Sequence, residues 1–165
     1  SNLPYNVGVP IMLKSMKYQQ IKYLTLMFQK EVAQKIELSL FPEKRKNKEM
    51  NSLHCLCQTY FEVSLLAKVP AGQFSPPPKV DSAVLSFKRR SVSKIPFQEW
   101  DLFEGFLRLL FGHRRKQIGS ILKGFYPVEE LELAAKNVEC SLTCRSETLT
   151  LSQVQKLFIN LRKEK

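Results

Sequence analysis

The sequence lacks several features that would place the protein in common classes. It contains no run of about 18 uncharged apolar residues, the length needed for a helix to cross a bilayer. Its beginning does not combine the charged, apolar and small-residue segments of a secretory signal, so we expect a cytoplasmic protein. No Gly-x-Gly run occurs either, and the six glycines are scattered. A glycine-rich turn that cradles a dinucleotide or nucleoside cofactor is therefore missing from these residues.

Residue types that bind metals or act as nucleophiles are scarce. The four cysteines form one Cys-x-Cys pair, Cys55 and Cys57, and one Cys-x3-Cys pair, Cys140 and Cys144. Zinc sites usually use Cys-x2-4-Cys pairs with matching geometry, which this arrangement fits poorly. We therefore expect no metal site, and reduced, partly buried thiols that pack as small hydrophobic groups. The two histidines are far apart in the sequence and are assigned no catalytic role.

Acidic residues are few compared with basic ones. The chain of 165 residues has 26 Lys and Arg against 15 Asp and Glu, a formal charge of +11. A surplus of this size predicts a polyanionic partner, nucleic acid before membrane. The hydrophobic content of 44% and charged content of 25% are typical of a folded globular protein, and the length suits one ordinary domain or two small ones.

The motif Asn2-Leu3-Pro4-Tyr5 has the chemistry needed to hold an exocyclic amino group of a base. Such a nitrogen is a poor nucleophile until its geometry frees the lone pair. The side-chain amide oxygen of Asn2 and the backbone carbonyl of Pro4 could each accept one amino N–H, and Tyr5 offers a flat face for stacking. Because Asn-Xaa-Pro is also an ordinary turn sequence, this motif alone leaves a turn without chemistry as an alternative.

Two further motifs follow in the chain. Residues 74–84 read Phe-Ser-Pro-Pro-Pro-Lys-Val-Asp-Ser-Ala-Val, and Arg114-Arg115-Lys116 follows Phe111. The three motifs, in this order, resemble the ribosomal RNA adenine dimethyltransferases of the KsgA type. The first is similar to motif IV of the amino-methyltransferases, the second to the substrate loop of the family and the third to its basic C-terminal helix.

The resemblance implies an activity and a set of roles. The family transfers methyl groups from S-adenosyl-L-methionine to the N6 atoms of two adjacent adenosines, in a hairpin near the 3′ end of small-subunit ribosomal RNA. Asn2 would touch both base and cofactor, and Leu3 would contribute backbone and packing beside the base. Phe74 would line the target-base pocket opposite Tyr5, although an aromatic residue that simply packs the loop onto the core is the alternative. Asp81 is interpreted as structural.

The surplus of positive charge also has candidate positions. The loop 43–48 and the triplet at 114–116 are either solvated surface or contacts to RNA phosphates. The predicted RNA-binding residues are Lys44, Arg45, Lys46, Lys79, Arg114, Arg115 and Lys116.

We predict an α/β fold, the C-terminal half of a Rossmann-like methyltransferase sheet, followed by a small helical domain. In this fold motif IV follows the fourth strand, so the chain looks as though it begins in mid-domain. We expect the cofactor half to be absent, the fragment alone to be inactive and the protein to be a monomer. Residues 1–93 would form the second half of the catalytic domain and residues 94–165 a helical RNA-binding domain.

The pattern of apolar residues predicts the individual elements. The run 23–28 is typical of a strand buried on both faces, 61–69 of a strand, and the alternating segment 80–88 of a strand at or near the sheet edge. Helices are predicted at 10–16, 31–36, 53–60, 97–111, 114–122, 128–138 and 151–161. Pro127 suits the first turn of one helix, and Thr150 or Ser152 could cap the last.

Three other functions remain open. The chemistry could serve large-subunit RNA, as in the Erm resistance enzymes, although the Pro-Pro-Pro-Lys-Val-Asp string and the helical tail favour the KsgA type. A DNA adenine methyltransferase would typically carry Pro-Pro-Tyr, from which Leu3 departs. A non-catalytic module for RNA binding or ribosome assembly is the alternative outside enzymes.

Overall fold

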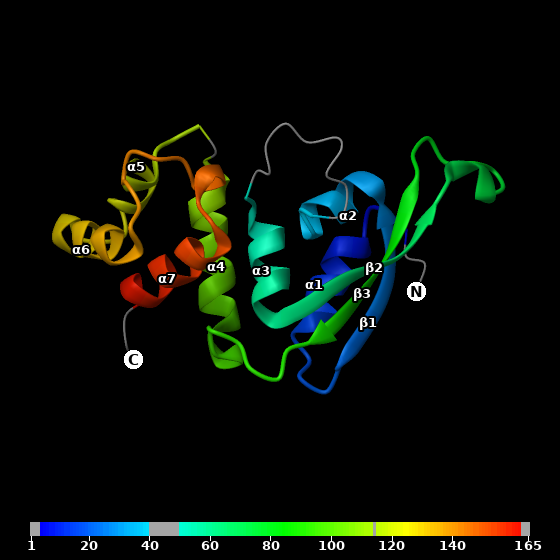
Figure 1. Ribbon diagram of the computed structural model, residues 1–165, viewed down its shortest axis with the longest axis horizontal. Helices are drawn as coiled ribbons and strands as arrows, with labels where there is room; N and C mark the ends of the chain where they lie inside the picture. Colours follow the sequence, from blue (N-terminus) through cyan, green and yellow to red (C-terminus); the bar gives the residue numbers. More distant parts are fainter. Residues whose placement is uncertain (1–3, 40–49, 114, 163–165) are drawn as a thin grey trace. The chain divides into compact units, whose positions relative to one another are not determined.

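The computed structural model describes residues 4–39, 50–113 and 115–162 of the chain, which fall into two compact units (Figure 1). The first unit contains the described residues 4–39 and 60–92, and the second contains 50–59 and 93–162. Residues 50–59 therefore group with the C-terminal helices and not with the sheet, unlike the division made from the sequence. The predicted domain limits of 1–93 and 94–165 stay a prediction.

The first unit is built on a three-stranded sheet. Strands β1 (Tyr23–Gln29) and β2 (Phe61–Val69) both pair antiparallel with β3 (Ser82–Arg89), and the strand order is β1-β3-β2. The strand predicted at residues 80–88, at or near the sheet edge, is thus the central strand of the described sheet and is paired on both sides. Alternation of apolar and polar residues reports which face of a strand is buried, and it does not report whether both sides are paired.

One face of this sheet carries the core of the unit. The helices α1 (Gly8–Met16) and α2 (Lys30–Ile36) contact it (Figure 1). Phe87 makes edge-to-face contacts with Phe28 and Phe61, at centroid distances of 6.3 and 6.5 Å. Strand β1 is only partly buried, and 66% of Tyr23 is exposed. The predicted burial of β1 on both faces is thus wrong for the described residues, since its apolar run has only one covered face there.

Arg89, at the end of β3, fixes the C-terminal end of α1. Its guanidinium donates hydrogen bonds to the carbonyl oxygens of Met16, Tyr18 and Ile21, at 2.7, 3.0 and 2.9 Å. The same group lies over the ring of Phe61, 4.6 Å from the centroid. Partial burial lowers the pKa of Arg89. One side chain thereby joins the helix that follows the first motif to two strands of the sheet.

The second unit is helical, as predicted. It contains most of α3 (Ser52–Tyr60), then α4 (Trp100–Gly112), α5 (Ile118–Leu122), α6 (Val128–Val138) and α7 (Leu151–Leu161). Short 3-10 turns precede α4 at Phe97–Glu99 and α7 at Ser146–Thr148, and another lies in the first unit at Ala71–Gln73. The predicted cap of α7 is confirmed. Thr150 and Gln153 form a reciprocal capping box.

The predicted basic helix at 114–122 is wrong in its first part. Helix α5 begins only at Ile118. Gln117 forms an isolated antiparallel bridge with Arg145, and the N–H of Ile118 donates to the carbonyl of Cys144 at 2.9 Å. The backbone of Gln117 and Ile118 is therefore paired with the segment before the 3-10 turn at Ser146–Thr148. Arg115 and Lys116, which precede it, lie in a turn instead of a helix.

Buried polar contacts join α3 to the C-terminal helices. The amide of Gln155 in α7 donates to the hydroxyl of Thr59 at 2.9 Å, and that hydroxyl donates to the carbonyl of Cys55 at 2.7 Å. Ser93 donates to the carbonyl of Thr59 at 3.0 Å. These contacts explain why residues 50–59 group with the second unit.

The described cysteines form no disulfide bonds, and Cys55 and Cys57 are buried. Burial raises the pKa of Cys55 to about 12. The described residues hold no group of three or more His, Cys, Asp or Glu side chains that could bind a metal ion. None of the described helices has the length and apolar character needed to cross a membrane.

Candidate active site at one end of the sheet

One end of the sheet gathers segments that are far apart in the sequence. Gln29 at the end of β1 and Val69 at the end of β2 both lie opposite Ser82, the first residue of β3. The backbone N–H of Lys30 donates to the carbonyl of Asp81 at 2.9 Å and continues this connection beyond the strands. The start of α2, which follows Gln29, and the loop between Val69 and Ser82 therefore adjoin each other at this end of the sheet.

Tyr5 joins this end of the sheet. Its hydroxyl and the Ser82 hydroxyl are 2.8 Å apart and form a hydrogen bond between residues 77 positions apart in the chain. The first motif and the loop motif of residues 74–84 are thus in direct contact. Tyr5 stays 37% exposed while its hydroxyl is held, so part of this residue is accessible to a base.

The backbone of Pro4 is already used. Its carbonyl oxygen accepts hydrogen bonds from the N–H groups of Val7 and Gly8, both at 3.1 Å. A carbonyl oxygen has two lone pairs, so an amino group of a base would compete with these contacts. The acceptor role predicted for Pro4 stays a prediction, and this geometry weighs against it.

The loop between β2 and β3 holds Phe74. Its N–H donates to the carbonyl of Ala71 at 3.2 Å, which ends the 3-10 turn, and its side chain is half-buried. The carboxylate of Asp81 accepts the N–H of Ala71 at 3.1 Å and fixes the start of the same turn. This contact supports the structural role predicted for Asp81. Within the described residues, no ring contact joins Phe74 to Tyr5.

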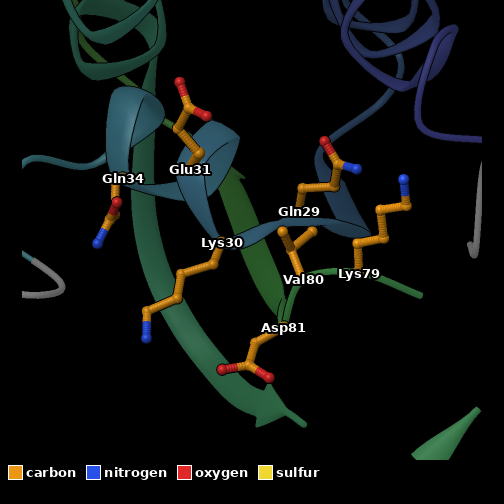
Figure 2. A pocket seen from close by; sticks show the side chains of 7 residues that line it. All are labelled: Gln29, Lys30, Glu31, Gln34, Lys79, Val80 and Asp81. Atoms are coloured by element: carbon orange, nitrogen blue, oxygen red, sulfur yellow. The ribbon is translucent and has the colours of Figure 1, made fainter. Parts of the chain in front are cut away.

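A pocket of about 450 Å³ opens beside this end of the sheet (Figure 2). It is lined from β1 and α2 on one side and from the segment before β3 on the other. The lining residues are Gln29, Lys30, Glu31, Gln34, Lys79, Val80 and Asp81. Glu31 is paired with Lys35 at 2.7 Å, and this hydrogen bond lowers the pKa of Glu31.

The predicted RNA-binding residues are distributed over both units. Lys79 is exposed and lines the pocket of the first unit. Arg115 and Lys116 are exposed in the second unit, where the N–H of Lys116 donates to the carbonyl of His113 at 2.9 Å. The remaining predicted site residues, Asn2, Leu3, Lys44, Arg45, Lys46 and Arg114, lie outside the described residues.

Reasoning from the sequence missed the residues that connect the site. Ser82 stands inside the loop motif, yet nothing in a lone serine indicates a hydrogen bond to a tyrosine 77 residues away. Gln29 and Gln34 were missed because their position depends on the strand register, which the sequence pattern did not determine. Their spacing around the start of a helix gives no recognisable signal by itself.

The comparison with protein families identifies the chain. The model of a family described as ribosomal RNA adenine dimethylase matches residues 1–162. The chain belongs to this family. The resemblance stated from the three motifs is therefore confirmed, and so is the α/β class of a partial methyltransferase fold.

Curated relatives agree with this membership, and a solved structure shares the fold. Two proteins named ribosomal RNA small subunit methyltransferase A, from Syntrophotalea carbinolica and Clostridium botulinum strain Loch Maree, are 33% and 35% identical over 95% of the chain. The chain spans 58% and 56% of their lengths. The crystal structure of the 23S rRNA methyltransferase ErmE matches 97% of this chain and 63% of its own, with a TM-score of 0.72 and 23% identity, and thus shares the fold.

Proposed function

We propose that the protein serves the S-adenosyl-L-methionine-dependent dimethylation of two adjacent adenosines, at their N6 atoms, in a hairpin near the 3′ end of small-subunit ribosomal RNA. The family and the names of the curated relatives support this assignment. The observation that carries it is the hydrogen bond of 2.8 Å between Tyr5 and Ser82, since it joins two family motifs at one end of the sheet.

The residues of this chain would act by positioning. The target adenosine leaves its stack and lies against the exposed face of Tyr5, with Phe74 as the opposite wall. The amide oxygen of Asn2 accepts one amino N–H and holds the nitrogen toward the methyl donor. The displacement is in line, so most of the acceleration comes from orientation of the reacting groups. Asn2 also touches the cofactor, and Leu3 packs beside the base.

The cofactor supplies a methyl group activated by a sulfonium centre. The described residues at the end of the sheet include hydroxyl, amide, aromatic and charged groups, and no glycine-rich turn accompanies them. By the resemblance to the family, Asn2 is the residue of this chain that would touch S-adenosyl-L-methionine, and we assign to this chain only the handling of the base. Taken alone, the 165 residues would be inactive.

Two transfers to one nitrogen impose a further condition. After the first transfer the amino group keeps one N–H, so one of its two acceptors loses its partner while the site must admit a methyl group. Since the Pro4 carbonyl already accepts two backbone N–H groups, Asn2 would be the acceptor on which both steps depend. The full-length product of the gene carrying Asn2→Ala should therefore lose both transfers. Time-resolved mass spectrometry of the product bases would measure this, and full dimethylation by the variant would contradict the role of Asn2.

The choice between the two ribosomal RNAs can be tested directly. Primer extension on small-subunit and large-subunit RNA, after incubation with the enzyme and cofactor, should stop only at the adjacent adenosines of the small-subunit hairpin. Stops confined to large-subunit RNA would instead support a reaction of the Erm type.

Calorimetric titration of S-adenosyl-L-methionine separates the enzyme from a non-catalytic module. We expect binding to the full-length gene product and none to this chain of 165 residues. If neither binds, the protein is better described as an RNA-binding module, and titration with small-subunit RNA becomes the deciding measurement.

A further inference from the structure

We propose that the pocket between β1, α2 and residues 79–81 binds the nucleotide next to the target adenosine, as a second base subsite. Gln29 would read an edge of this base, Val80 would pack against it and Lys79 would contact its phosphate. The proposal rests on the function proposed above, because it takes the target base to lie on Tyr5.

The position of the pocket follows from the strand register. Tyr5 is hydrogen-bonded to Ser82, and Ser82 lies directly opposite Gln29 in the antiparallel pair of β3 and β1. Gln29 lines the pocket together with Val80 and Lys79, which precede Ser82 by two and three positions. The pocket therefore begins one residue pair away from Ser82, which holds the Tyr5 hydroxyl, so a nucleotide next to a base on Tyr5 could enter it.

The chemistry of the lining suits a base better than a small anion or a cation. An amide presents a donor and an acceptor together and can pair with the edge of a base in two hydrogen bonds, as Gln does with adenine. In the described structure neither the amide of Gln29 nor the ammonium of Lys79 has a hydrogen-bond or ion-pair partner. Gln29 precedes α2 but its side chain does not cap the helix.

The carboxylates of the pocket are already engaged. Glu31 accepts from Lys35, and Asp81 accepts from the N–H of Ala71. The side chains of Gln29, Gln34 and Lys79 are consequently the groups of the pocket most available to a ligand. Figure 2 shows that the side chains of Gln29 and Lys79 extend in the same direction, beyond Val80. Val80 is 44% exposed, an apolar surface that the flat face of a base would cover.

The size of the pocket agrees with this occupant. Its volume of about 450 Å³ lies in the range of sites for small organic ligands, roughly 300–1,000 Å³. A single nucleotide belongs to this size class, whereas a duplex does not. Because the pocket has positive and negative groups in balance, it differs from a simple phosphate patch and favours readout of a base.

A double-mutant cycle, with one change in the protein and one in the RNA, tests the contact between Gln29 and the flanking nucleotide. The full-length gene product, without cofactor, is titrated with the small-subunit hairpin and with the same hairpin made abasic at each nucleotide flanking the target adenosine, by fluorescence anisotropy at one salt concentration. Gln29→Met keeps the size of the side chain and removes its hydrogen bonds. We expect it to weaken binding of the intact hairpin about tenfold, and to have no further effect on the hairpin abasic at one of the two flanking positions.

Two more variants complete the design. Gln34→Met removes the amide on the α2 side and should give a smaller coupling to the same abasic position. Gln20→Met is the matched control, since Gln20 is exposed in the turn before β1 and lies outside the pocket. It should bind both hairpins like the wild type. The proposal would be overturned if, for each of the two abasic hairpins, the loss of affinity caused by Gln29→Met multiplied with the loss caused by the abasic change.

The same samples keep the two proposals apart. Methylation of the intact hairpin in the presence of cofactor is followed by mass spectrometry. Methylation without coupling at Gln29 would overturn the subsite alone. Coupling without methylation would overturn the proposed reaction and leave the subsite in place. Failure of the wild type to bind the hairpin more tightly than an unrelated one would overturn both.

Discussion

At the scale of single residues, the hydrogen bond between Tyr5 and Ser82 joins the first motif to the loop motif. We expect Tyr5→Phe to lower kcat/KM for methylation by about fivefold, because a net hydrogen bond contributes about 1 kcal/mol. The ring and its stacking face remain, so activity should persist. Ser82→Ala should have the same effect, and the double variant should be no slower than either single one. Single-turnover methylation of the hairpin by the full-length product measures all three rates.

Tyr18→Phe provides the control for this cycle. Tyr18 is 53% exposed, and its hydroxyl makes no hydrogen bond within the described residues. Its loss should leave the rate unchanged. Independent effects of Tyr5→Phe and Ser82→Ala, which would multiply in the double variant, would show that the hydrogen bond does not position the ring.

The buried thiol of Cys55 predicts a dependence of stability on pH. Burial raises the pKa of Cys55 from 9.0 to about 12. Between these values the unfolded chain loses a proton that the folded protein keeps. The contribution to stability is therefore complete below pH 9 and is lost as the pH rises towards 12, at roughly 1.4 kcal/mol per pH unit at most.

Thermal unfolding of the wild type and of Cys55→Ala between pH 8 and 11 would measure this effect. The remaining ionisable groups are the same in both proteins, so only the difference in slope is informative. The wild type should lose stability more steeply than the variant. Parallel curves would mean that Cys55 ionises in the folded protein much as it does in the unfolded chain.

At the scale of elements, the sequence predicted most helices and strands but not how they pair. The limits of α6 and of α7 with its cap follow from local signals, because apolar periodicity and a Thr-x-x-Gln box act within a few residues. The central place of β3 and the loss of helix at Arg115 and Lys116 depend on distant segments. The bridge between Gln117 and Arg145 is such a contact, and no pattern within one helix contains it.

The contact of Arg89 with α1 yields a prediction for a whole element. Arg89→Lys keeps the charge, but a single ammonium cannot donate in the planar fork that reaches three carbonyl groups. We expect the free energy of unfolding of the first unit to fall by about 2 kcal/mol. Urea denaturation followed by far-ultraviolet circular dichroism measures the change.

Arg90→Lys is the matched comparison for Arg89. Arg90 lies 3.7 Å from a carboxylate oxygen of Glu62, which is 57% exposed, so its ion pair contributes little. This variant should change the free energy of unfolding by less than about 0.5 kcal/mol. Equal effects of the two variants would show that the three carbonyl contacts of Arg89 do not stabilise the unit.

At the scale of the whole molecule, the site could be predicted only as far as the motifs extend. The order of three motifs gave the family, and the hydrogen bond between Tyr5 and Ser82 brings the first two together. The pocket beside them was not predicted. It arises from the register of β1 against β3, and register depends on packing and turn geometry that a single sequence does not state.

The charge of +11 on these 165 residues predicts that RNA binding by the full-length product is sensitive to salt, and the predicted contacts can be separated from bulk charge. Each phosphate contact contributes about 0.9 to the slope of log K against log salt concentration on a duplex stem. If Arg115 and Lys116 contact phosphates, replacing both by Gln should reduce the magnitude of this slope by about 1.8.

The double variant Lys136→Gln and Lys156→Gln is the control, because it removes the same charge from exposed positions of α6 and α7 that are not predicted to contact RNA. This control should weaken binding only slightly and leave the slope nearly unchanged. Equal reductions in the two double variants would mean that the surplus charge attracts RNA as a whole, without a contact at the turn that carries Arg115 and Lys116.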